Sequence, residues 1–206
     1  MSSPSPSGGS VNLKHSQSCK RIAILFRNAL VGVGWCDCSR RECVMIKIGQ
    51  FVSVLQNPEA SMATKAAALK LVVHFVGDIH QPLHDEDNGD RDGSTLEVLF
   101  DSDPDNLHWM GDSRLLQHIN GNSQALAEEL ENRITGQNLD EWEGGSVLQW
   151  ASEAHQLARA VVYGNLKADN PAPITAAYKR GADRAIKVPL NTARVRLKWL
   201  SNETLR

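Results

Sequence analysis

The sequence predicts an all-α domain, from two observations. Apolar residues recur at three- and four-residue steps in several separate segments, and this spacing places them on one face of a helix. No strand-rich region competes with these segments. With 206 residues, 41% of them hydrophobic, the chain is long enough for a single mainly helical domain with its own core.

The first predicted helix lies around residues 62–76, where four apolar residues recur at helical spacing: Ala66, Leu69, Val72 and Val73. It should end between Gly77 and Gln81, because Pro82 disfavours helical geometry at the residue before it. Residues 85–105 are dense in Asp, Asn and Gly. They predict a long polar loop that carries at most a small hairpin around residues 96–100.

Three further apolar stripes predict helices in the second half of the chain. The stripes are Leu126, Leu130 and Ile134; then Val147, Trp150, Ala154, Leu157, Ala158 and Val161; then Leu190, Ala193, Leu197 and Leu200. Pro189 stands directly before the third stripe. Proline is favoured at the first helical position, so we expect that helix to begin there.

The amino-terminal residues differ in composition from the rest. Residues 1–10 are rich in Ser, Pro and Gly, which predicts a disordered tail. Lys20 and Arg21 precede an apolar stretch, but Arg27 interrupts it and no clean small-residue cleavage site follows. The sequence therefore contains no convincing signal peptide, and a short amphipathic segment is the alternative. No apolar run is long enough to span a membrane, so we expect no membrane association.

The charge balance restricts the class of function. A net charge of −2 at pH 7 argues against a protein that binds nucleic acid through a broadly basic surface. A hydrolase of phosphate esters is still compatible, because bound divalent cations can supply positive charge locally.

The segment HFVGDIHQPLH, residues 74–84, is the most informative about function. His74 and Asp78 lie four residues apart, so on a helix their side chains share one face and can converge on one ion. His84 follows the break at Pro82, where a turn can direct another imidazole toward the same region. Imidazole and carboxylate are both zinc ligands, so the pair makes half of a tetrahedral zinc site, although a single such pair is more often a surface or core pair.

A second segment, NLHWMGD, repeats the arrangement with His108 and Asp112, again four apart. Two such pairs and one further histidine favour metal binding over isolated surface pairs. His80 and His118 are better explained as hydrogen-bonded or solvated histidines. The acidic run in residues 85–92 lacks the ligand order of an EF-hand, so we expect a solvated loop rather than a calcium site.

These motifs resemble the S1/P1 nuclease family. HFVGDIHQPLH matches every fixed position of the family signature HFxGDxxQPLH, and NLHWMGD is similar to its NLHxxWD motif. WASEAHQLARAVVY, residues 150–163, resembles the family's WAxES helix, and residues 178–200 resemble its terminal helix pair. The resemblance covers about residues 37–203. It implies the helical fold of phospholipase C and P1 nuclease, with residues 1–36 as an unmatched segment and residues 37–206 as a truncated family domain.

The resemblance also implies roles for the five candidate ligands. His84, His108 and Asp112 correspond to the three protein ligands of one zinc. His74 and Asp78 correspond to two ligands of a neighbouring zinc, and Asp78, which also reaches a third zinc, is the expected catalytic residue. In the family an upstream Trp, two His and an Asp complete these sites, and none of the four has a counterpart in residues 1–36. The family binds three zinc ions, and one well-formed zinc site is therefore expected in this chain. Its activity is expected to be impaired.

Four further positions follow from the same comparison. Ser94 stands where the family has the Asn of a Gly-Gly-Asn loop near the nucleobase, so a substrate contact is expected there. Glu153 and His155 are expected to orient the metal ligands, with ordinary exposed helix residues as the alternative. Gly111 stands where the family has Trp, and the missing indole leaves a space to be filled or closed.

The family is secreted, and this carries implications for the cysteines. Cys38 and Cys43 correspond to a family disulfide, whereas Cys19 and Cys36 match nothing and should stay unpaired. Asn202 opens the sequon Asn-Glu-Thr, which is compatible with glycosylation and export.

The implied function is a zinc-dependent endonuclease. Its substrates would be single-stranded DNA and RNA and nucleotides, its products would carry 5′-phosphates, and the protein would act as a monomer. One alternative is a non-catalytic remnant that binds zinc without turnover. A second is a zinc phospholipase C-like esterase, against which the NLH motif and the lack of a lipid-facing apolar loop both argue.

Overall fold

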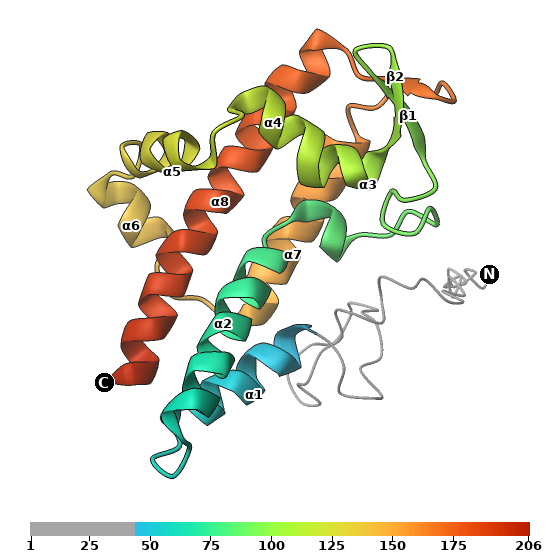
Figure 1. Ribbon diagram of the computed structural model, residues 1–206. Coiled ribbons are helices and arrows are strands. Elements are labelled where there is room, and N and C mark those ends of the chain that lie inside the picture. The colour runs from blue at the N-terminus through green and yellow to red at the C-terminus, as the bar shows by residue number, and fades with distance from the viewer. Residues whose placement is uncertain (1–43) are drawn as a thin grey trace, which may run out of the picture.

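The computed structural model describes residues 44–206, which form a mainly helical body with one small sheet (Figure 1). The predicted tail and the cysteine pair lie outside the described residues. Helix α1 (Val44–Gln56) packs against α2 (Met62–Asp78). Ser61 begins α2 by accepting a hydrogen bond from the Thr64 amide. As predicted, α2 ends just before the Gln-Pro break.

The predicted polar loop and its hairpin are both present. A 3-10 turn, η2 (Pro82–Asp85), follows α2 and leads into the loop. Strands β1 (Glu97–Phe100) and β2 (Asp103–Asn106) pair antiparallel, and the short β3 (Ala172–Pro173) adds to β1 in parallel. The sheet order is β2-β1-β3.

The remaining described chain is helical. Its elements are α3 (Leu107–Trp109), the π-helical turn η3 (Met110–Arg114), α4 (Leu115–Ile119), α5 (Ser123–Glu131), α6 (Gly136–Trp142), α7 (Val147–Leu157), the π-helical turn η4 (Ala158–Tyr163) and α8 (Ala176–Leu205). A capping box of Ser146 and Gln149 begins α7, and the apolar stripe predicted there continues into η4. None of the described helices has the length and apolar character to cross a membrane.

Two details of the predicted helices were wrong. Pro189 does not begin a helix: it lies inside α8, a single helix where a helix pair was expected. Proline removes one backbone hydrogen bond, but buried residues on both sides of it, such as Ala185 and Ala193, pack against the rest of the protein and keep the helix continuous. Ile134 falls beyond the end of α5, so only Leu126 and Leu130 of that stripe are helical and buried.

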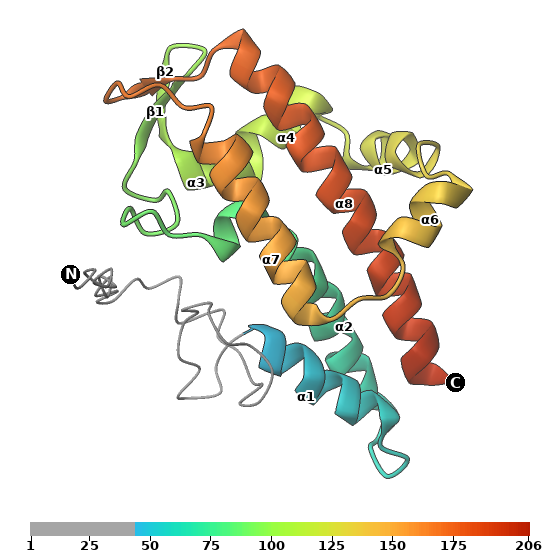
Figure 2. The ribbon, with the colours of Figure 1, turned by 180° about the vertical axis from the view of Figure 1, so that it is seen from behind.

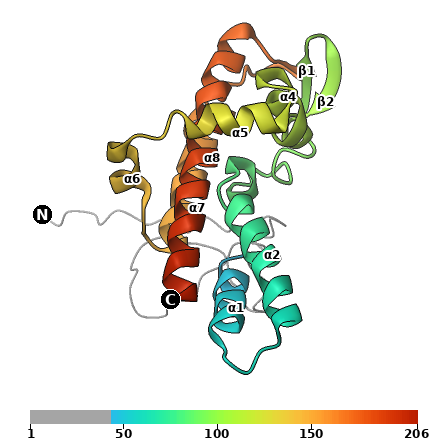
Figure 3. The same cartoon turned by 60° about the vertical axis from the view of Figure 1, so that its left-hand side comes forward.

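The interior contains two apolar clusters, and α8 contributes to both (Figures 2 and 3). The first joins α1, α2, α7 and the end of α8, with Ile48, Val72, Val76, Ile79 and Trp150 at its centre. The second joins η2, the sheet, α3 to α4 and the start of α8, with Leu83, Val98, Leu107 and Met110 at its centre. The two segments that carry the candidate metal ligands, residues 74–84 and 106–112, meet beside the second cluster.

Candidate metal centre

Three of the predicted ligands converge. One ligand atom from each of His84, His108 and Asp112 lies within 4.8 Å of the other two. His84 comes from η2, and the other two come from the run α3–η3. Nε2 of His108 is 3.3 Å from Asp112 Oδ2, and Nε2 of His84 is 3.5 Å from Asp112 Oδ1. We call these three residues the metal group.

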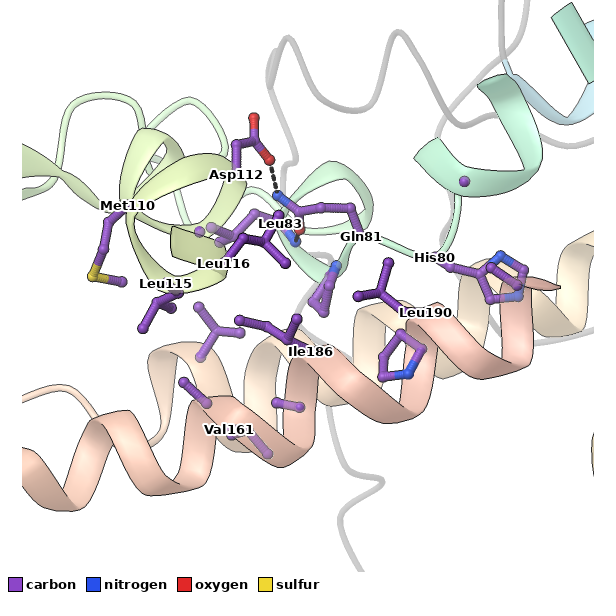
Figure 4. Close-up of a pocket in the computed structure, with 18 of the residues that line it drawn as sticks. His80, Gln81, Leu83, Met110, Asp112, Leu115, Leu116, Val161, Ile186 and Leu190 are labelled. Carbon is purple, nitrogen blue, oxygen red and sulfur yellow. Dashed lines mark hydrogen bonds between the residues drawn. The ribbon is translucent and has the colours of Figure 1, made fainter. Parts of the chain in front are cut away.

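Local sequence explains how η2 presents its histidine. Gln81 is extended before Pro82, and its side-chain oxygen accepts the Leu83 amide, so the chain turns at once into η2. The Gln81 side-chain amide also donates to Asp112 Oδ1 at 2.7 Å (Figure 4). Gln81 therefore shapes the turn and ties it to the element that carries the other two ligands.

Each histidine of the metal group has a second contact that orients its ring. Nδ1 of His108 donates to the Asp92 carbonyl at 2.8 Å, which leaves Nε2 facing Asp112. Nδ1 of His84 lies 2.7 Å from Asp78 Oδ1. Histidines that bind metal usually donate their other ring nitrogen to a carbonyl or carboxylate in this way. The donor set and its outer contacts therefore fit a divalent metal ion.

The charges of the group explain its protonation. Burial raises the pKa of Asp112, but hydrogen bonds from His108, His84 and Gln81 outweigh it and hold that pKa well below its usual range. The hydrogen bond to Asp112 raises the pKa of His108 against the effect of burial. Burial lowers the pKa of His84, but hydrogen bonds to Asp112 and Asp78 and their charges raise it to about 10. Without metal, the His84 ring is therefore a positively charged imidazolium at neutral pH, and His108 gains its second proton more readily than a free imidazole does.

Metal binding should accordingly release protons. A ligating imidazole must be neutral, so we expect one zinc ion to displace between one and two protons at pH 6.5, with affinity falling between about 10-fold and 100-fold for each pH unit lowered. Titration calorimetry in two buffers of different ionisation enthalpy measures the number. The His108→Gln variant should release about one proton. Zinc binding with no proton release would contradict this description of the group.

The other predicted pair lies next to the metal group but outside it. Asp78, at the end of α2, contacts the group at His84. His74 lies one turn earlier on the same helix and is exposed, with its ring 5.2 Å from that of Phe75. Within residues 44–206, the structure thus assembles three of the five ligands and leaves His74 and Asp78 beside them.

His155 contacts the residues that follow His84. Its Nδ1 lies 3.0 Å from the Asp85 carbonyl and 2.6 Å from Glu86 Oε2, so α7 holds the end of η2. Asp85 itself was expected in a solvated loop, and that expectation was wrong because its side chain is buried. Burial raises its pKa well above the usual value, and the neighbouring charges of His84 and Asp78 act in opposite directions on it.

Glu153 acts at a different place. Its carboxylate lies 2.7 Å from Arg196, a buried residue of α8 whose guanidinium also contacts Nε2 of His80 at 3.1 Å. Nδ1 of His80 donates to the Val76 carbonyl at 2.7 Å, so Nε2 accepts from Arg196. Burial lowers the pKa of His80 to about 4, which keeps this ring neutral. No sequence pattern indicated Arg196, which joins α7 and α8 to the turn after α2.

A largely apolar cavity of about 280 Å³ adjoins the metal group (Figure 4). Gln81 and Asp112 line one side of it, and α8 lines the other. Gly111 also lines this cavity, and a Cβ built there would lie 3.2 Å from Leu83 Cδ1. The space expected at Gly111 is therefore closed on the side of Leu83 and open toward the cavity.

Ser94 lies on the surface near the metal group. It is exposed and lines a separate polar hollow of about 420 Å³. The Gly93 carbonyl before it accepts the His108 amide at 3.3 Å, which places the hollow next to the start of α3. Thr95, Glu97 and Asn106 also line the hollow.

The chain is similar in sequence to several named nucleases. The chain is 30% identical over 137 residues to Nuclease S1 of Aspergillus oryzae, covering 58% of this chain and 47% of that protein. It is 29% identical over 143 residues to Nuclease P1 of Penicillium citrinum (61% and 53%) and 27% identical over 151 residues to Endonuclease 3 of Arabidopsis thaliana (64% and 51%). The chain thus spans about half the length of the curated relatives it matches. Residues 33–206 match the S1/P1 Nuclease family, and the chain belongs to that family.

Proposed function

We propose that the protein is a zinc-dependent nuclease that hydrolyses phosphodiester bonds in single-stranded DNA and RNA and leaves 5′-phosphates on its products. The observation that carries the proposal is the metal group, in which His84, His108 and Asp112 converge with oriented rings. Membership of a nuclease family supports the reaction class.

The donor set supports zinc as the metal. Two imidazoles and one carboxylate are common zinc ligands, and three protein ligands leave a position for substrate. A zinc ion held there would polarise a phosphate oxygen and lower the pKa of bound water. The role of the protein is to fix the ligands: Gln81 and Asp78 hold Asp112 and His84 in place, and the Asp92 carbonyl holds His108.

Asp78 is the residue we propose as catalytic. Its carboxylate contacts His84 and, with His74 one turn away on α2, offers two ligands to a second zinc next to the first. Two neighbouring metal ions could stabilise both the attacking and the leaving oxygen of the phosphate. Because the described residues supply only these two ligands, we propose that the second zinc is held weakly and that activity is impaired.

The incomplete second set of metal ligands favours a second candidate function. A protein with one complete metal group and half of another would bind zinc and phosphate with little turnover. Zinc content without hydrolysis separates this candidate from the nuclease.

The activity prediction follows from the ligand count. The purified 206-residue protein should release acid-soluble nucleotides from single-stranded DNA slowly, and only with added zinc. A chelator should abolish the reaction, and Asp78→Asn should lower the rate at least about tenfold, because it removes a ligand carboxylate and the partner of His84. Supplying a family segment with the further ligands should raise the rate. Hydrolysis that resists the chelator would contradict a metal-dependent mechanism.

The remaining proposals concern secretion, disulfide pairing and glycosylation. We propose a secreted monomer in which Cys38 and Cys43 form a disulfide, while Cys19 and Cys36 remain unpaired. Asn202 is exposed near the end of α8, which supports it as a glycosylation site. Peptide mapping under non-reducing conditions tests the pairing, and a Cys36–Cys43 bond would contradict it.

A further inference from the structure

Trp109 is an exposed aromatic side chain that the metal group does not use. It lies on α3 with 55% of its surface exposed, although tryptophan is a residue whose burial stabilises proteins strongly. The Asn106 side chain accepts the Trp109 amide at 2.8 Å, so the backbone at this position is fixed by a helix cap. A rigid backbone therefore holds an indole on the surface.

The position of Trp109 in the chain places it next to the metal group. It directly follows His108, and consecutive Cα atoms are about 3.8 Å apart. It precedes Asp112 by three residues on the continuous helical run formed by α3 and η3. Trp109 is thus an exposed aromatic residue on the same helical run as two of the three metal ligands, and it is adjacent in the chain to one of them.

The surroundings of Trp109 suit a nucleobase rather than a phosphate. Asn106, which caps α3 before Trp109, also lines the polar hollow that contains Ser94, Thr95 and Glu97. These side chains offer hydroxyl, amide and carboxylate groups, which can pair with the polar edges of bases. No lysine or arginine lines the hollow among the described residues, so a phosphate would find no opposite charge there.

We propose that Trp109 stacks on a base of single-stranded nucleic acid, next to the phosphate held at the metal group. The inference rests on the proposed nuclease function and adds a substrate contact to it. An aromatic face accepts any base, because every base has a π-face, so the contact favours unpaired strands without choosing a sequence. A base stacked within a duplex would not be available to the indole.

The test measures binding separately from cleavage. The full chain, loaded with zinc, is titrated with a phosphorothioate oligothymidylate of about eight nucleotides. Saturable quenching of tryptophan fluorescence should accompany binding. Trp109→Ala should remove most of the quenching and weaken binding roughly 5- to 100-fold, and Trp109→Phe should keep most of the affinity. Trp142→Phe, on α6 away from the metal group, is the matched control and should change neither affinity nor the fractional quenching by much.

The outcomes distinguish the two proposals. Equal affinity of wild type and Trp109→Ala, with unchanged zinc content, would overturn the stacking contact and leave the nuclease proposal standing. Absence of any binding by the wild type would overturn the stacking contact as well. Binding that depends on Trp109, together with no hydrolysis of unmodified single-stranded DNA, would support the contact and count against the nuclease.

Discussion

The His84→Ala variant should lose its zinc. The substitution removes one of three ligand atoms and leaves the Asp78 carboxylate without the imidazole that it contacts. Since weakening even an outer contact of a metal ligand costs 10- to 100-fold in affinity, loss of a ligand should cost at least about 100-fold. Metal analysis after gel filtration in micromolar free zinc measures the content directly.

The control for this experiment is His118→Ala. His118 is an exposed histidine of α4 outside the metal group, and its ring packs against the edge of Phe100. It should retain the wild-type zinc content. Circular dichroism should show that both variants keep their helices. Equal zinc content in wild type and a folded His84→Ala variant would remove the assignment of the site.

The Arg196→Leu variant should be strongly destabilised. The guanidinium is buried, ion-paired with Glu153, hydrogen-bonded to His80 and the Trp142 carbonyl, and 5.4 Å from the centre of the Trp150 ring. Leucine would leave the buried Nε2 of His80 without its donor and remove the cation–π contact. The combined loss should be roughly 3 kcal/mol, or about 6–12 °C in Tm for a domain of this size.

Arg194 on the same helix provides a matched control. Its side chain is 46% exposed and pairs with Glu131 on the surface. Exposed pairs contribute about 1 kcal/mol or less, so Arg194→Leu should shift Tm by no more than a few degrees. Thermal unfolding followed by circular dichroism compares the two variants. Similar shifts would show that the buried network around Arg196 contributes no more than a surface ion pair.

The sequence predicted the elements that depend on local chemistry. Pro82 marks the end of α2, and the four-residue spacing of His108 and Asp112 places both on one helical face. The convergence of His84 with that pair is a different matter, since the loop between them has no periodic pattern. It was expected only because the motifs resemble those of a known family.

The features that were missed depend on tertiary packing. Asp85 belongs to an acidic stretch, and composition cannot distinguish a solvated carboxylate from one enclosed by the fold. Arg196 on α8 meets Glu153 on α7 and His80 in the turn after α2, so no local spacing connects them. Pro189 satisfied a local rule for helix starts, but packing on both sides of it extends α8 past that point.

A metal ion bound by the metal group would cross-link two segments that are far apart in the chain. His84 precedes the polar loop and hairpin in the chain, and His108 and Asp112 follow them. An ion that joined these ends would close a loop as a covalent cross-link does, and for a loop of this length the chain-entropy relation for disulfides gives roughly 3.5 kcal/mol. Chelation should therefore loosen residues 85–107 before it affects α1 and α2, and hydrogen exchange should speed up first in β1 and β2.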